Sequence, residues 1–485
     1  MLWKPSTSVY VITPTRRKFG QRIIDLHRNP FNSRESKLVL FKYFERDSDS
    51  DIIWFALQKT WALFAIALFV VTSRLWLPQT LFPQVALMEL FNGFPSEIAY
   101  GAMAVVFITL LSILLGKFSH DSVPITLKSR SLLWTIIFAA IVLLWLTDQH
   151  RIQPWAVHLV VGALVFITCR PQRGVALLRM LAISIYIYSA LGKFDYQFMH
   201  SMGPQLLTGL AGLIDVDMKT WDSTLVSKLS LLLPLGEFLI GIMLCHRRTR
   251  KIAILSATIM HSCLAVLFSP LGLNHEWGVV LWNVFFILQN AMLFGAMLLT
   301  GISKCRWGSK LAAAVIATEV ELSGHTIDNS ITPRAQWIGQ LLLTAVLIMP
   351  SLEPFTVVDH WPSWGLYSPR NSRVLVRVYL SAGTKTDEIE QFFQPQFGNA
   401  AFRVLDVSRW SLETLGVPIY PQQRYQLGVA LAVAQKYNLG RSIEVDLLSM
   451  SDRLTGSRQR ETLRGVEAIQ MACQRYRLNA VPRRF

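Results

Sequence analysis

Apolar segments recur along most of this chain, and their length limits what it can fold into. A helix needs about 20 mostly apolar residues to cross a hydrocarbon core. Nine runs reach or approach that length, although the fourth and the ninth are short; they lie at residues 54–73, 97–116, 131–147, 154–169, 175–193, 225–245, 252–269, 277–300 and 336–350. Since 52% of the 485 residues are hydrophobic and 16% are charged, the composition is not that of an ordinary soluble protein. The sequence predicts an α-helical polytopic membrane protein with about nine transmembrane helices.

The loops between these segments predict the direction of each crossing. Cytoplasmic loops carry an excess of Lys and Arg, and the loops after the second, fourth, sixth and eighth segments are basic, whereas those between them are acidic or sparsely charged. We therefore predict a plasma (inner) membrane protein with a cytoplasmic N-terminus, nine crossings and an extracytoplasmic C-terminal domain. An even number of crossings would place that domain in the cytoplasm, so the prediction depends on the two short segments.

Clusters of basic residues give the chain a formal net charge of +16 at pH 7. They lie between the apolar runs and not on one soluble face, so the positive-inside rule accounts for them and we predict no nucleic-acid partner. Residues 1–51 hold ten Lys or Arg residues and lack an apolar core. They predict a cytoplasmic basic arm and not a cleavable signal peptide. None of the five cysteines lies in a C-x-x-C pair, which argues against a dithiol centre, a zinc site or a disulfide framework.

The composition changes near residue 351 to that of a small soluble domain. Apolar residues alternate with polar ones at Val374–Leu380 and again at Ile443–Leu447, which predicts half-buried strands. Pro421 precedes a helical run that extends to about Tyr437. A second helix is expected to place five residues on one face, namely Leu463, Val466, Ile469, Cys473 and Tyr476. We predict an α+β domain over 351–485, and an interfacial aromatic belt at Trp361, Trp364 and Tyr367.

Ionisable residues within the apolar segments are the candidate functional residues. Charged groups at membrane depth cost several kcal/mol, so they usually face a bundle interior, a partner or a water-filled cavity. Glu237 lies about twelve residues into the sixth segment and cannot easily reach either membrane edge. His261 lies near the middle of the seventh segment, at a depth where it could meet Glu237. We predict a polar pocket open to the outer face, with four residues at its mouth and two deeper ones: Lys193, Asp195, His275 and Glu276, then Glu237 and His261.

Structural explanations compete with this pocket. Arg179 and Lys193 lie about 21 Å apart on one helix, and each could extend to its nearer membrane edge. A single buried His is often only hydrogen-bonded structure. Glu276, Asn283 and Asn290 recur every seven residues, so this polar seam should point into the bundle, where hydrogen bonds between helices would explain it equally well. The spacing matches no helical metal motif such as H-E-x-x-H, so we predict no metal site.

Short motifs in the same region suggest a family. Arg179 opens a helix, the run Ser189-Ala190-Leu191-Gly192-Lys193-Phe194 lies at its far end, and the next helix carries Pro234-x-x-Glu237-x-x-x-Gly241. These motifs resemble the DoxX and MauE group of redox-associated membrane proteins, whose unit is a four-helix module, here residues 175–300. They also resemble the wider HTTM set, which includes the membrane part of vitamin K-dependent carboxylase. In that set a lysine is linked to quinol-driven chemistry, a role that the resemblance would carry onto Lys193 alone.

The chain departs from those families in three ways. Residues 52–174 add transmembrane helices in front of the module, paired cysteines are absent from the sequence, and the domain at 351–485, which follows the loop and last helix at 301–350, does not match the carboxylase.

The first functional hypothesis is a DoxX/MauE-like bundle that binds a quinone or similar isoprenoid lipid and supports redox chemistry or the maturation of an exported partner. Lys193 would hold or deprotonate a polar head group, Glu237 and His261 would relay the proton, and Asp195, His275, Glu276 and Asn283 would bind the ligand. A non-enzymatic scaffold or transporter is the alternative. A transporter should show two similar halves with interrupted helices. The sequence shows no such halves, although Gly192 and Gly236 could interrupt helices. A carboxylase-like enzyme that modifies proteins is a third hypothesis.

Overall fold

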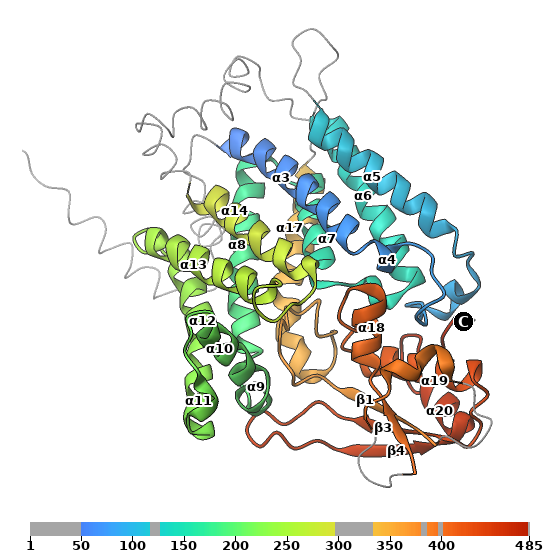
Figure 1. Ribbon diagram of the computed structural model, residues 1–485. Helices are drawn as coiled ribbons and strands as arrows, with labels where there is room; N and C mark the ends of the chain where they lie inside the picture. Colours follow the sequence, from blue (N-terminus) through green and yellow to red (C-terminus); the bar gives the residue numbers. More distant parts are fainter. Residues whose placement is uncertain (1–49, 117–126, 296–332, 380–385, 396–400, 484–485) are drawn as a thin grey trace, which may run out of the picture. The chain divides into compact units, whose positions relative to one another are not determined.

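The computed structural model describes residues 50–116, 127–295, 333–379, 386–395 and 401–483 (Figure 1). Almost all of the predicted basic arm at 1–51, and most of the predicted cytoplasmic loop after the eighth apolar segment, lie outside these residues. Asp49–Phe485 forms one compact unit. The account below concerns that unit alone.

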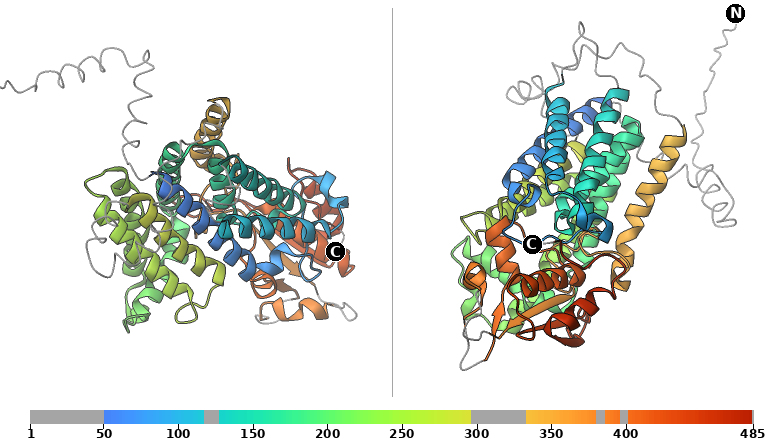
Figure 2. Two further views of the ribbon diagram at one scale, coloured as in Figure 1. Left: turned by 90° about the horizontal axis from the view of Figure 1, so that it is seen from above. Right: turned by 90° about the vertical axis from the view of Figure 1, so that its right-hand side faces the viewer.

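Each of the nine apolar segments lies on helical structure. The helices are α3 (Ser50–Val71), α5 (Ile98–Leu115), α6 (Leu127–Thr147), α7 (Pro154–Thr168), α8 (Pro171–Leu191), α11 (Ser223–Ser230) with α12 (Leu232–Cys245), α13 (Arg250–Phe268), α14 (Trp277–Phe294) and α17 (Pro333–Ile348). Within the described residues, eight stretches are long and apolar enough to cross a membrane, and α11 with α12 counts as one of them. Helix α7 is the shorter ninth, with 15 residues, and Pro154 begins it as expected. Helix α17 packs against α7 at the edge of the helices (Figure 2).

Four connections between these helices meet the C-terminal region. Leu87, between α3 and α5, accepts a hydrogen bond from the Asn479 amide at 3.2 Å. The Gln149 side chain, between α6 and α7, donates to the Asn479 carbonyl at 2.7 Å. After α8 the Tyr196 amide donates to the Arg453 carbonyl at 2.8 Å, and Phe268 at the end of α13 stacks on Tyr367. Since two helices separate each connection from the next, with α11 and α12 counted as one, the helices from α5 to α13 alternate in direction, including α7.

Shorter helices fill the connections. They are α4 (Ser73–Trp76), η1 (Glu89–Gly93), η2 (Gln149–Arg151), α9 (Tyr196–His200), α10 (Met202–Gly212), η3 (Met218–Thr220) and η5 (Met349–Phe355). Gly192 caps α8, whereas Gly236 lies inside an uninterrupted α12. Arg179 lies in the third turn of α8 and is 3% exposed, and its Nε donates to the Leu293 carbonyl at 2.5 Å. Its guanidinium therefore packs inside the bundle, against the last turn of α14.

The C-terminal region contains a four-stranded antiparallel sheet in the order β2-β1-β3-β4. The strands are β1 (Arg373–Val378), β2 (Arg403–Leu405), β3 (Ile443–Leu448) and β4 (Arg460–Arg464), and the helices are η6 (Asp387–Phe392), α18 (Val407–Leu415), α19 (Gln423–Lys436) and α20 (Gly465–Cys473). The two predicted strands and the helix after Pro421 are confirmed. The second helix was predicted to begin too early, because Leu463 belongs to β4 and pairs with Val445. Gly465, at φ 78°, makes the turn from strand into helix.

The strap, residues 361–367 between η5 and β1, contradicts the predicted aromatic belt. Trp364 is fully buried, its ring 6.1 Å from that of His158 on α7. Trp361 packs against Tyr420 of the C-terminal region. Tyr367 stacks on Phe268 with ring centres 5.0 Å apart. The strap folds back onto the helices and the C-terminal region, where burial of these rings removes apolar surface from water.

Candidate functional site

An ion pair links α8 to α12. Lys193 follows the last turn of α8, where its Nζ lies 2.5 Å from Glu237 Oε2. The same Nζ donates to Ser189 Oγ at 2.7 Å, because residues four apart lie on one face of the chain here. Both charged side chains are largely buried. Each charge is thus compensated by the other, as burial requires.

A neutral hydrogen-bond network surrounds His261 of α13. Asn283 donates its Nδ2 to the Val279 carbonyl at 2.9 Å, so its Oδ1 is the acceptor for His261 Nδ1–H at 2.8 Å. His261 Nε2 then accepts the hydroxyl proton of Tyr186, 2.6 Å away on α8. Asn290 donates to the same hydroxyl oxygen at 2.6 Å. A neutral imidazole with its proton on Nδ1 satisfies every one of these bonds.

These two groups face one cavity of about 290 Å³. Its wall includes four of the seven residues that the sequence analysis assigned to the site, namely Lys193, Glu237, His261 and Asn283. The remainder is mostly apolar and comes from several elements, with Phe198, Leu206, Leu210, Leu233, Met260, Cys263, Leu264, Trp282, Phe286 and Leu366. A few polar groups in an apolar sleeve can orient a ligand that has a polar head and an apolar body.

The other three assigned residues lie outside the wall of this cavity. Asp195 caps the short helix α9, its Oδ1 accepting from the Phe198 amide at 2.8 Å. Burial raises the pKa of this carboxyl, although Arg370 and Arg453 nearby oppose that shift. His275 and Glu276 contact each other at 3.8 Å. Glu237 and His261 share the cavity, but Glu237 pairs with Lys193 and His261 with Tyr186 and Asn283.

Two residues of the strap also line the cavity, and the sequence analysis did not assign either of them to the site. Leu366 and Tyr367 reach it from beyond the last apolar helix. The sequence offered one signal for this region, the aromatic residues Trp361, Trp364 and Tyr367, and such residues also predict an interfacial belt. Within the residues that the structure describes, no three His, Cys, Asp or Glu side chains gather as a metal site would require.

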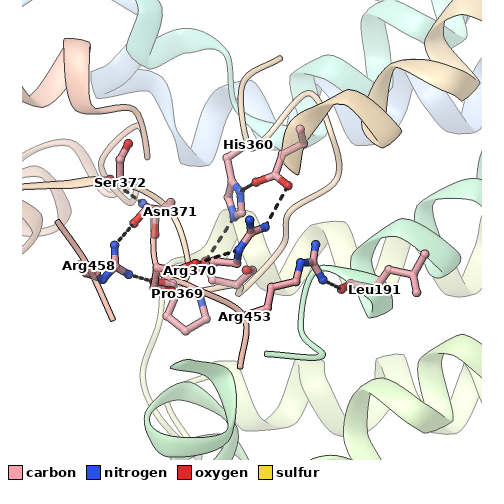
Figure 3. A network of polar contacts seen from close by, with 11 residues as sticks. Leu191, His360, Pro369, Arg370, Asn371, Ser372, Arg453 and Arg458 are labelled. Atoms are coloured by element: carbon pink, nitrogen blue, oxygen red, sulfur yellow. Dashed lines mark hydrogen bonds and ion pairs between the residues drawn. The ribbon is translucent and has the colours of Figure 1, made fainter. Parts of the chain in front are cut away.

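A second polar cluster, called here the junction, joins the helices to the C-terminal region. His360 Nδ1 lies 3.0 Å from Glu353 Oε1, and its Nε2 lies 3.2 Å from the Ser368 carbonyl. Both partners are acceptors, so only a doubly protonated imidazole can donate to each of them. Arg370 contacts Glu353 from the other side at 3.4 Å, and Arg453 donates to the Leu191 carbonyl (Figure 3).

The junction continues at the loop between α6 and α7. Arg424 of α19 donates to Gln149 Oε1 at 2.8 Å and forms a bidentate pair with Asp359. Burial raises the pKa of Asp148 to about 6 and lowers that of His150 to about 4. The sequence analysis assigned no role to this loop.

In the part of the chain that the structure describes, fold and site together define a mostly helical protein with eight candidate membrane spans, a small antiparallel sheet and an apolar cavity that carries a buried ion pair. No protein-family model, curated protein or solved structure matches the chain.

Proposed function

We propose that this chain is a multi-pass protein of the plasma (inner) membrane that binds a quinone or similar isoprenoid lipid. It crosses nine times, with its N-terminus in the cytoplasm and its C-terminal domain outside. The observation that carries this proposal is the cavity beside Lys193 and Glu237, whose walls are otherwise mostly apolar. A head group with acceptor oxygens could accept a hydrogen bond from Lys193, and a ring with an isoprenoid tail could pack against the apolar wall of the cavity.

The proposed chemistry is proton exchange at the head group. Lys193 is an ammonium with three N–H donors, of which Glu237 and Ser189 take two. The third is available to a carbonyl oxygen of the ligand. Glu237 would accept a proton from a hydroxyl group of the head group, which is left as its conjugate base, and the pair Tyr186–His261 offers a second route for that proton. This role agrees with the resemblance to DoxX, MauE and HTTM proteins. In the cell it would support redox chemistry or the maturation of an exported partner.

The test is mass spectrometry of the organic extract from purified protein. We expect a quinone or isoprenoid lipid in the native chain, and its loss in Lys193→Ala and Glu237→Gln. The matched controls are Lys228→Ala and Glu467→Gln, which change exposed residues that do not line the cavity. Identical phospholipid in all five samples would contradict the proposal.

A scaffold is the second candidate, because the buried polar groups of the cavity also satisfy one another. In that case Lys193 and Glu237 only pin α8 to α12, and the C-terminal domain recruits a partner. Replacing both residues with apolar ones would then leave function unchanged.

A further inference from the structure

Two bulky residues of the strap have an unusual backbone conformation. Trp364 has φ 61° and Tyr367 has φ 56°. This left-handed region is sparsely populated by large side chains and persists where the surroundings fix it. Such positions are frequent at binding sites, which indicates that the strap does more than link two elements.

Close packing holds the strap in place on both sides. A Cβ atom on Gly365 would lie 2.5 Å from the His360 ring, so only glycine fits at this position. Gly192 caps α8 beside Lys193, and a Cβ atom on Gly192 would lie 3.8 Å from the Gly365 Cα. Trp364 is fixed beside His158. The strap is therefore packed against the end of α8 that carries the ion pair.

Tyr367 presents its phenol to the cavity. Its ring stacks on Phe268 at an interplanar angle of 11°, and the residue lines the cavity with Glu237 and Lys193. Among the described residues its hydroxyl has no hydrogen-bond partner. Burial and the carboxylates of Glu276 and Glu237 raise the pKa of Tyr367 well above its ordinary value, so the hydroxyl keeps its proton. The phenol is a permanent donor in an apolar wall.

We propose that Tyr367 is a ligand-binding residue, donating a hydrogen bond to a second acceptor oxygen of the head group whose first oxygen meets the free N–H of Lys193. The inference rests on the proposed function and narrows its ligand class to head groups with two acceptor oxygens, such as quinones. It also makes the strap part of the pocket, so a bundle without the C-terminal region lacks one of its donors.

The experiment measures binding of two probes to purified protein in detergent, corrected for micelles without protein. The first probe is 2,3-dimethyl-1,4-naphthoquinone. The second is 2,3-dimethylnaphthalene, which has a similar planar shape and no acceptor oxygen. Tyr367→Phe keeps the stacked ring and removes only the hydroxyl. The matched control is Tyr196→Phe, at an exposed tyrosine outside the cavity wall.

We expect Tyr367→Phe to weaken quinone binding about 3- to 10-fold, the effect of one hydrogen bond. Binding of the hydrocarbon should stay unchanged, which also shows that the pocket is folded. Equal quinone binding by Tyr367→Phe and the native chain would overturn the inference while leaving the proposed function in place. Equal weakening for both probes would overturn it too, since packing would then be the cause. A native chain that does not bind the quinone would refute the proposed function itself.

Discussion

The cavity and the junction both bury charged groups, but they satisfy them differently. At the junction, Arg424 donates hydrogen bonds to Gln149 and Asp359. Arg151 donates to the Leu75 carbonyl and to Thr147 Oγ1. At the cavity, Lys193 and Glu237 pair beside open space of about 290 Å³. Charges that bond only to protein groups hold two parts together, whereas charges beside a cavity can also hold a ligand. The predictions below test that distinction.

The largest effect is expected from Asp359→Ala at the junction. It would leave the buried Arg424 guanidinium without its carboxylate partner, at a cost of about 3–5 kcal/mol in the free energy of unfolding. Thermal unfolding in detergent measures the loss. The control is Glu413→Ala, which removes an exposed pair with Arg409 on α18 and should cost less than about 1 kcal/mol. Similar losses in both variants would mean that the junction is not specifically held by this pair.

The second largest change in the free energy of unfolding is expected from the pH dependence of two groups at the junction, Asp148 and His150. Folded Asp148 has a pKa of about 6 against an ordinary 3.8, so between these values the folded protein keeps a proton that the unfolded chain has lost. Its contribution to stability therefore falls as the pH rises through that window. His150, at about 4 against 6.5, behaves in the opposite way, and its contribution rises with pH. Each amounts to about 3 kcal/mol at 1.36 kcal/mol per pKa unit.

The two contributions nearly cancel in the native chain, and single variants should separate them. Relative to the native protein, Asp148→Asn should gain stability as the pH rises from 4 to 6, and His150→Gln should lose it. Unfolding midpoints across this range give the measurement. Parallel curves for all three proteins would show that neither group is buried as described.

A smaller effect is expected at the strap. Gly365→Ala forces a Cβ against the His360 ring, which should cost about 1–3 kcal/mol and reduce binding of the naphthoquinone probe. Gly236→Ala is the matched control, because a Cβ there meets no atom within 4 Å and alanine favours the helix. Unchanged binding in Gly365→Ala would separate the strap from the pocket.

The sequence predicted the helical segments well because apolar length is a local property. It also drew attention to Lys193 and Glu237, since charges at membrane depth need partners. It did not indicate the burial of Asp148 and His150, or the entry of Tyr367 into the cavity. Those positions depend on contacts between distant parts of the chain, such as His150 Nε2 with the Pro418 carbonyl, 268 residues further on, and Phe268 with Tyr367, which no local pattern encodes. Asp195 does not line the cavity, and its side chain caps α9 instead.

The most direct test of the central claim is the double variant Lys193→Met/Glu237→Leu. It removes both charges together, so no uncompensated charge remains and the fold should be retained, which an unfolding midpoint near the native value would show. The measurement is the lipid or quinone that co-purifies with it, compared with the native chain. If the cavity is a ligand site, the variant is folded but has lost the ligand. A folded variant that retains the same ligand in the same amount would contradict the account and leave the ion pair as a link between helices.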